Sequence, residues 1–284
     1  MQKQILFSFL FLLFLTGSSL ATSSYRRPAP VDRTFVSAKI DEVVSSVAVK
    51  IADPELRELW VDCYPNTLDT TVNYSATTAN QSIGSTFVIT GDIQAMWLRD
   101  STWQVDGYLQ YAAGDAHLLA MLKGLAQRQW YSVIMDAYAN AFNYDDNCQG
   151  HQSDYRTPPM TCGLFEGKFE IDSLCSVLRL SSSLYEVTRD PSLLSPDWLK
   201  AVSVIYRVFK YQQSSTIDMT YLDGPLYYSF ARQTTVPTDT LLHRVRFIKK
   251  GSYLLLFTVN LINLFSGWPT WCSKWNDQEP IPTI

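Results

Sequence analysis

The sequence lacks an excess of positive charge, a pattern of metal ligands and a long hydrophobic run. The 23 Lys and Arg residues against 27 Asp and Glu residues leave a formal net charge of -4. No basic cluster stands out, so nucleic acid is not expected as a partner. The 3 histidines and 5 cysteines show no metal-ligand spacing, and neither a metal nor another cofactor is expected.

The N-terminus has the pattern of a signal peptide. Lys3 precedes an apolar stretch at residues 5–15, and small residues follow up to Ala21. The apolar stretch is too short for a membrane span, which needs about 20 residues. We therefore expect a signal peptide at 1–21, a linker at 22–34, and a secreted or lumenal protein of the secretory pathway with no membrane span after cleavage. An uncleaved signal anchor is the alternative.

Entry into the secretory pathway allows N-glycosylation and disulfide formation. Asn73 and Asn80 each begin an Asn-x-Ser sequon in a polar, loop-like stretch, so both are candidate glycan acceptors. Cys148 and Cys162 flank a polar loop with glycine and prolines, which makes them the best candidate disulfide pair. Cys175 is expected on the apolar face of a helix as a small buried side chain.

Apolar residues recur every three to four positions along most of the chain, which predicts helices joined in antiparallel pairs. A strand-like run is visible only at residues 86–90, so the expected fold class is all-α. The loop at 143–167 is longer than most connections and indicates the rim of a site. Helix starts are expected at or near Asp32, Asp53, Asp115, Glu170 and Ser195.

The first candidate site lies in the stretch 91–104. It places Asp92, Arg99 and Asp100 beside Trp97, at the start of an expected helix. Carboxylates that accept hydroxyl protons, a guanidinium fork and a flat indole face are the groups that a sugar-binding pocket needs. The alternative is a helix N-terminus with Asp100 as its cap and an ordinary Asp92–Arg99 ion pair.

The second candidate site is a cluster that contains Glu166, Lys168, Glu170 and Asp172. For Glu166 and Glu170, a structural role near a helix N-terminus is an equal alternative, since the helix dipole favours negative charge there. Helical spacing places Asp172 near the edge of the buried face. Partial desolvation there would raise its pKa and suit a general acid, one of the two carboxyl groups that glycoside hydrolysis needs.

Two long motifs carry a resemblance to a known family. Gly-Asp-Ile-Gln-Ala-Met-Trp-Leu-Arg-Asp-Ser at 91–101 and Phe-Glu-Ile-Asp-Ser-Leu-Cys at 169–175 are similar to those of glycoside hydrolase family 125. Its members are exo-acting α-1,6-mannosidases. The resemblance covers residues 35–242 and implies part of an (α/α)6 toroid, in which six helical hairpins surround a central cup.

The resemblance also implies roles for individual residues. Asp172 would be the general acid of an inverting, metal-independent hydrolysis of terminal α-1,6-linked mannose. Trp97, Arg99 and Asp100 would hold the terminal mannose, with Asp92 in support. The expected partner is a mannose-containing oligosaccharide or glycan.

The chain departs from the family pattern after residue 242. The segment 243–284 reads as an atypical tail, and the family's general base, a Glu far toward the C-terminus, has no counterpart in it. The toroid is therefore expected to be incomplete. The first alternative function is an inactive truncated fragment that at most binds mannosides. The second alternative is a product that does not fold stably, because uncovered apolar faces favour aggregation.

Overall fold

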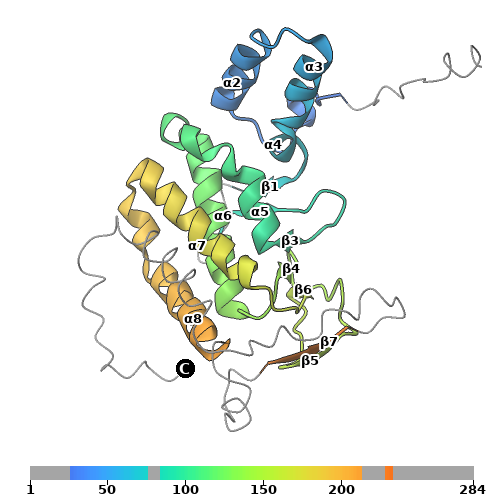
Figure 1. Ribbon diagram of the computed structural model, residues 1–284, viewed down its shortest axis with the longest axis vertical. Helices are drawn as coiled ribbons and strands as arrows, with labels where there is room; N and C mark the ends of the chain where they lie inside the picture. The colour runs from blue at the N-terminus through green and yellow to red at the C-terminus, as the bar shows by residue number, and fades with distance from the viewer. Residues whose placement is uncertain (1–25, 76–83, 213–227, 233–284) are drawn as a thin grey trace, which may run out of the picture.

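The computed structural model describes residues 26–75, 84–212 and 228–232, and they are mostly helical (Figure 1). The α-helices are α2 (Ala38–Ala48), α3 (Pro54–Cys63), α4 (Asn66–Thr70), α5 (Leu98–Asp106), α6 (Ala116–Met135), α7 (Ile171–Thr188) and α8 (Pro196–Gln212). Short 3-10 helices are η1 (Pro30–Asp32), η2 (Leu109–Gly114) and η3 (Pro191–Leu194). The strands are β1 (Val72–Tyr74), β2 (Thr86–Val88), β3 (Met96–Trp97), β4 (Ala141–Phe142), β5 (Tyr155–Thr157), β6 (Leu164–Glu166) and β7 (Ser229–Ala231).

Most of the expected helix starts are confirmed. The carboxylate of Asp53 accepts hydrogen bonds from the first turn of α3, and that of Asp115 does the same for α6. Ser195 caps α8, and Glu170 occupies the N-cap position of α7. The predicted helix start at Asp32 is wrong. The segment that contains Asp32 begins with a proline and forms the 3-10 helix η1. Helix α2 begins only at Ala38, and its N-cap is Ser37.

The longer helices pack around one core. Helix α5 packs against α7. Helix α6 packs against both α7 and α8 (Figure 1). The rings of Trp130 on α6 and Trp198 on α8 lie 5.6 Å apart, and the Trp130 indole donates to Ser181 Oγ at 2.8 Å. The expectation of a mostly helical chain is confirmed. The described residues do not show a closed toroid, so the toroid stays a prediction.

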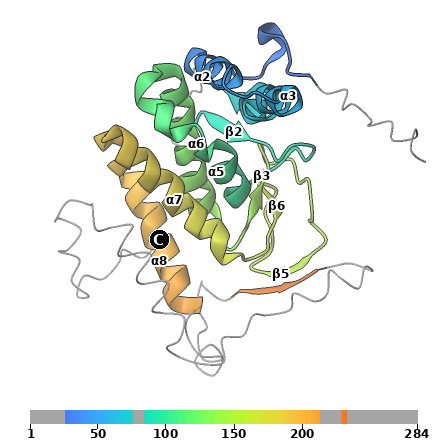
Figure 2. The ribbon, with the colours of Figure 1, turned by 45° about the horizontal axis from the view of Figure 1, so that its top comes forward.

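Among the described residues, three small antiparallel sheets accompany the helices, so the description of the chain as all-α was too coarse. Their strand orders are β1-β2, β3-β4-β6 and β5-β7. In the middle sheet, β3 and β6 are both antiparallel to β4, so they run in the same direction. Helix α5 follows β3 directly, and α7 begins shortly after β6. The N-termini of α5 and α7 therefore emerge at the same end of this sheet (Figure 2).

A buried polar contact fixes the position of α5. The side-chain amide of Gln129 on α6 is fully buried and donates to Leu98 O at 3.2 Å and to Ser101 Oγ and Thr102 Oγ1 at 2.9 Å. Thr102 Oγ1 in turn donates to Ser176 O on α7 at 3.2 Å. Because such groups are costly to bury unpaired, they specify how α5, α6 and α7 fit together.

Two glycines let the segment before β2 cross α6 closely. Gly84 has φ +86°, a left-handed conformation that favours glycine, and a side chain there would meet the backbone of Arg128. A side chain on Gly124 of α6 would collide with Ser85. Thr86 Oγ1 then donates to Met121 O at 2.7 Å, which anchors β2 on the helix.

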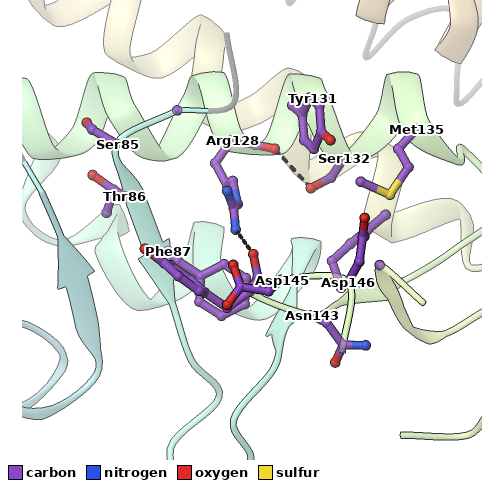
Figure 3. A pocket seen from close by; sticks show the side chains of 14 residues that line it. Ser85, Thr86, Phe87, Arg128, Tyr131, Ser132, Met135, Asn143, Asp145 and Asp146 are labelled. Carbon is purple, nitrogen blue, oxygen red and sulfur yellow. Dashed lines mark hydrogen bonds between the residues drawn. The ribbon is translucent and has the colours of Figure 1, made fainter. Parts of the chain in front are cut away.

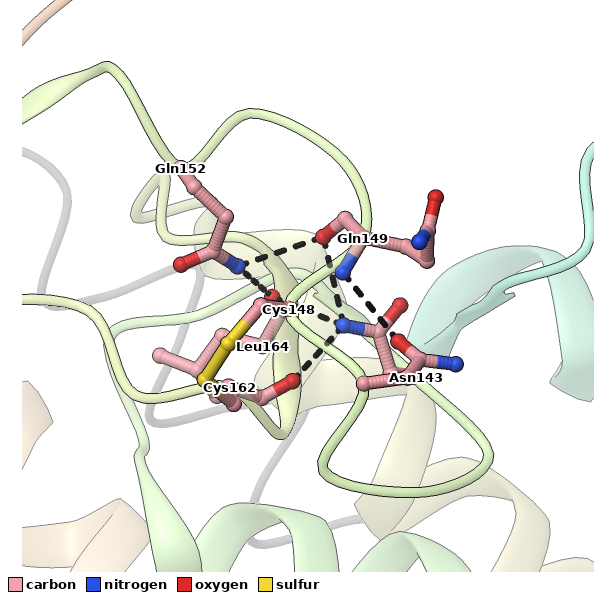
Figure 4. The surroundings of a disulfide bond; sticks show 7 residues. Asn143, Cys148, Gln149, Gln152, Cys162 and Leu164 are labelled. Atoms are coloured by element: carbon pink, nitrogen blue, oxygen red, sulfur yellow. Dashed lines mark hydrogen bonds between the residues drawn. A yellow bond between two sulfur atoms is a disulfide. The ribbon is translucent and has the colours of Figure 1, made fainter.

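The long loop at 143–167 contains β5 and β6 and a disulfide. The structure joins Cys148 to Cys162 (Figure 4). The side-chain amide of Asn143 donates to Cys162 O at 2.8 Å, Leu164 O at 3.1 Å and Gln149 O at 3.2 Å, so one buried residue holds both sides of the loop. Cys175 is partly buried and unpaired.

The glycosylation candidates differ in what the structure describes. Asn73 is exposed, but it lies on β1 rather than in the expected loop, because the sequence from Pro65 onward forms α4 and the β1–β2 pair. Asn80, the signal peptide at 1–21 and the atypical tail at 243–284 lie outside the described residues. Within the described ranges, no helix is long and apolar enough to span a bilayer.

Candidate active site

The two sequence motifs meet at one guanidinium. Arg99 stands in the first turn of α5, and its Nη1 donates to Glu170 Oε2 at 2.9 Å and to Asp172 Oδ2 at 3.1 Å. Glu170 and Asp172 stand at the start of α7. This contact follows from the parallel course of β3 and β6, which brings both helix N-termini to one place. We call the side chains of Trp97, Arg99, Asp100, Glu170 and Asp172 the Arg99 cluster.

The Arg99 cluster is rich in negative charge that cations compensate. Asp100 Oδ2 lies 3.5 Å from Arg99 Nη2, and Lys168 Nζ lies 2.9 Å from Glu170 Oε1. Burial acts to raise the pKa of Glu170, but hydrogen bonds and charge from Lys168 and Arg99 outweigh it and hold that pKa below its usual value. Glu170 therefore stays ionised and fixes the guanidinium, in line with the favourable dipoles of two helix N-termini.

Trp97 completes one side of the cluster. It occupies the N-cap position of α5, is partly buried, and its ring lies 5.3 Å from that of Phe165 at an interplanar angle of 62°. Asp100 is therefore a first-turn residue, and the expectation that it caps α5 is wrong. Asp92 lies exposed in the turn before β3, while the ion-pair partners of Arg99 are Asp100 and the two carboxylates of α7.

The burial expected for Asp172 is wrong. Its side chain is 55% exposed. The buried face of α7 begins with Ser173 and Leu174, and Ile171 is itself 37% exposed, so helical spacing from Ile171 misplaced the edge of the core. In the described structure, Asp172 is a solvent-exposed carboxylate held by one arginine.

Glu166 has a different environment from the one the sequence suggested. It lies on β6, is 8% exposed, accepts a hydrogen bond from Asn140 Nδ2 at 2.5 Å and pairs with Arg232. It is therefore a buried structural anion rather than a carboxylate of the helix N-terminus. No local pattern points to Asn140 or Arg232, because they are 26 and 66 residues away in sequence.

Arg156 is a second residue that sequence analysis missed. Its side chain is fully buried, its Nη2 pairs with Asp136 Oδ1 at 2.6 Å, and its Nε donates to Gly167 O at 2.8 Å. The backbone N–H of Phe169 donates to the Tyr228 hydroxyl at 2.8 Å. These bonds set the path of the chain between β6 and α7 and so place Glu170.

The arrangement suits a polyhydroxylated ligand. Arg99 is 37% exposed and Asp100 is 32% exposed, so both can reach a ligand, and the indole offers a flat apolar face. Within the described part of the chain, no group of three or more His, Cys, Asp or Glu side chains is arranged to hold a metal ion.

Comparisons with known proteins match this part of the chain. The family model described as metal-independent alpha-mannosidase (GH125) matches residues 53–249. The meiotically up-regulated gene 157 protein of Schizosaccharomyces pombe is 38% identical over 224 residues, which is 76% of this chain and 44% of that protein. A Streptococcus pneumoniae structure, described as a non-productive substrate complex with alpha-1,6-mannobiose from a new family of metal-independent alpha mannosidases, is 36% identical with a TM-score of 0.62. The match covers 72% of this chain and 44% of that one. The chain thus spans less than half the length of either relative.

Proposed function

The chain belongs to the GH125 family of metal-independent alpha-mannosidases, and from this premise we propose that it hydrolyses terminal α-1,6-linked mannose at the Arg99 cluster. The observation that carries the proposal is the double contact of Arg99 Nη1 with Glu170 and Asp172, which unites the two motifs. The alpha-1,6-mannobiose in the streptococcal relative supports the substrate class. The helices described here would form part of an (α/α)6 toroid.

In this proposal Asp172 is the general acid. Arg99 and Asp100 bind hydroxyl groups of the terminal mannose, and Trp97 packs against an apolar face of the ring, so the glycosidic oxygen is held beside Asp172. The bond between the anomeric carbon and this oxygen breaks as Asp172 donates its proton to the leaving oxygen. Water attacks the anomeric carbon from the opposite face, loses a proton to an acceptor outside the Arg99 cluster and leaves mannose with inverted configuration.

Binding without turnover is the second candidate function, and one observation favours it. Glu170 and Asp172 both lie within 3.1 Å of the same nitrogen atom. An inverting pair must be about 6.5–9.5 Å apart to admit a water molecule, so Glu170 is too close to serve as the base for Asp172. The low pKa of Glu170 also makes it a poor proton acceptor.

One pair of measurements tests both functions on the full chain. Calorimetry with α-1,6-mannobiose measures binding, and proton NMR of the same mixture detects mannose and its anomeric configuration at release. Product with inverted configuration that disappears in Asp172→Asn supports hydrolysis. Binding that persists without product supports the second candidate. Turnover that survives in Asp172→Asn would refute the acid assignment.

We also infer that the protein enters the secretory pathway. The signal-peptide pattern at 1–21, the Cys148–Cys162 disulfide and the exposed Asn73 in its sequon support this compartment. Expression in eukaryotic cells should give a secreted or lumenal product whose electrophoretic mobility changes on endoglycosidase treatment. Asn73→Gln should reduce the mobility change on endoglycosidase treatment, because one glycan is lost.

A further inference from the structure

A cavity of about 290 Å³ lies between β2, α6 and the chain after β4 (Figure 3). It shares no lining residue with the Arg99 cluster. Its volume lies just below the range of small-molecule pockets, about 300–1,000 Å³, which limits a ligand to roughly one sugar ring. Its wall includes Ser85, Phe87, Arg128, Tyr131, Tyr144 and Asp145.

Arg128 is the central charge of this cavity. It is 8% exposed, and its guanidinium lies 5.1 Å from the ring centre of Phe87 and 5.2 Å from that of Tyr144. Its Nη2 donates to Tyr144 O at 2.5 Å, and among the described residues it forms no ion pair. Burial lowers the pKa of this guanidinium. Because a buried charge is costly without acceptors, ligand oxygens here would add hydrogen-bond acceptors for this guanidinium.

The mouth of the cavity carries the opposite charge. Asp145 and Asp146 line it, and both are exposed. In Figure 3, Arg128 extends from α6 toward Phe87 and Asp145. An anion would accept hydrogen bonds from Arg128 but would be repelled by the two carboxylates. A cation would be attracted by the carboxylates but repelled by Arg128. Hydroxyl groups satisfy both, since each can accept from a guanidinium and donate to a carboxylate.

We propose that this cavity is a second carbohydrate site, which binds one neutral sugar unit through Arg128 and Asp145 and takes no part in hydrolysis. Tyr131 and Tyr144 supply the aromatic surface against which the apolar face of a sugar ring packs. The site would hold a second residue of a glycan, or a neighbouring chain of it, independently of the Arg99 cluster.

The test is a titration of the full chain with methyl α-D-mannopyranoside, followed by NMR, in the wild type and in Arg99→Gln. Arg99→Gln removes the candidate active site, so saturable sugar binding that remains reports the cavity. Adding Asp145→Ala to this background should weaken the remaining binding about tenfold or more, because a charge-assisted hydrogen bond is lost. Asp197→Ala, an exposed aspartate in the first turn of α8, is the matched control and should leave binding unchanged.

Three outcomes would overturn the proposal. Sugar binding that vanishes entirely in Arg99→Gln assigns all of it to the candidate active site. Sugar binding that is equally strong with and without Asp145→Ala removes the cavity from the contact. Saturable binding of inorganic phosphate in place of the sugar identifies an anion site. Asp145 is exposed and its replacement threatens no core contact, so the test does not depend on whether Arg128 variants fold.

Discussion

The ion pair between Lys123 of α6 and Asp190, just beyond α7, should make stability depend on pH. Lys123 Nζ lies 2.7 Å from Asp190 Oδ2, and Asp190 Oδ1 accepts from the backbone N–H of Ser192 at 2.9 Å. The hydrogen bond from Lys123 is the largest cause that lowers the pKa of Asp190 from 3.8 to about 2. Since the folded pKa is the lower one, the stabilisation is complete above 3.8 and is lost as pH falls through about 2.

The size of the effect follows from the pKa shift and the exposure. Taken at face value, the shift from 3.8 to about 2 corresponds to about 2.4 kcal/mol of unfolding free energy. Both side chains are about a quarter exposed, at 27% and 25%, so solvent screening reduces this to about 1 kcal/mol. Asp190→Asn retains the acceptor for Ser192. It should therefore cost about 1 kcal/mol at pH 7, and about half of that difference should be gone by pH 3.

Urea unfolding followed by tryptophan fluorescence measures this difference, because Trp130 and Trp198 are buried in the core that α6 and α8 share. Wild type and Asp190→Asn are compared at pH 7, 5 and 3, with Asp197→Asn as a control for an exposed aspartate. A stability difference that stays the same from pH 7 to pH 3 would refute the role of the ionised carboxylate.

Three further predictions concern residues that place the site. Gln129→Leu should lower the unfolding free energy by about 2 kcal/mol, because the two N–H groups of the amide each contribute about 1 kcal/mol through hydrogen bonds to α5; a thermal melt that is unchanged would contradict this. Gly124→Ala should lower the unfolding free energy by about 1–3 kcal/mol despite the better helix propensity of alanine, since the new methyl group collides with Ser85. Urea unfolding measures this loss, and Gly114→Ala, where open space surrounds the residue, is the control. Glu170→Gln should weaken α-1,6-mannobiose binding about tenfold in calorimetry, because Arg99 loses one of its charged partners; unchanged affinity would show that Glu170 does not position Arg99.

Local sequence signals predicted the helices well where a cap was present. Asp53, Asp115 and Ser195 each carry a side-chain oxygen that accepts a hydrogen bond from the first helical turn. Both partners of such a bond lie within three residues, so the local sequence is enough to predict it. Asp32 failed because its neighbours favoured a 3-10 turn, and Ser37 made the cap five residues later. The strand β2 lies within the strand-like run predicted at 86–90, but the other strands escaped prediction because two or three residues give no readable alternation.

The geometry of the candidate site, in contrast to the helix starts, could not be predicted from local sequence. Both motifs were located, but the contact between Arg99 and Glu170 joins residues 71 positions apart, and no local pattern encodes it. It depends on the order β3-β4-β6 and on Gln129, which were visible only in three dimensions. The burial of Asp172 was misjudged for a related reason. A helical wheel gives the direction of a side chain relative to its own helix, but the neighbouring elements decide whether solvent reaches it.

The exposure of Asp172 distinguishes the proposed acid from the residues around it. The groups that we propose orient a sugar are fixed by the core, since Gln129 and Thr102 tie the first turn of α5 to α6 and α7. The proposed acid, in contrast, is 55% exposed, whereas general acid catalysis works best where water is excluded from the reacting groups. A mannoside held by Arg99 would cover Asp172 and remove part of that water. We therefore expect substrate binding to need only the contacts described here, while turnover needs the ligand itself to complete the enclosure of the acid.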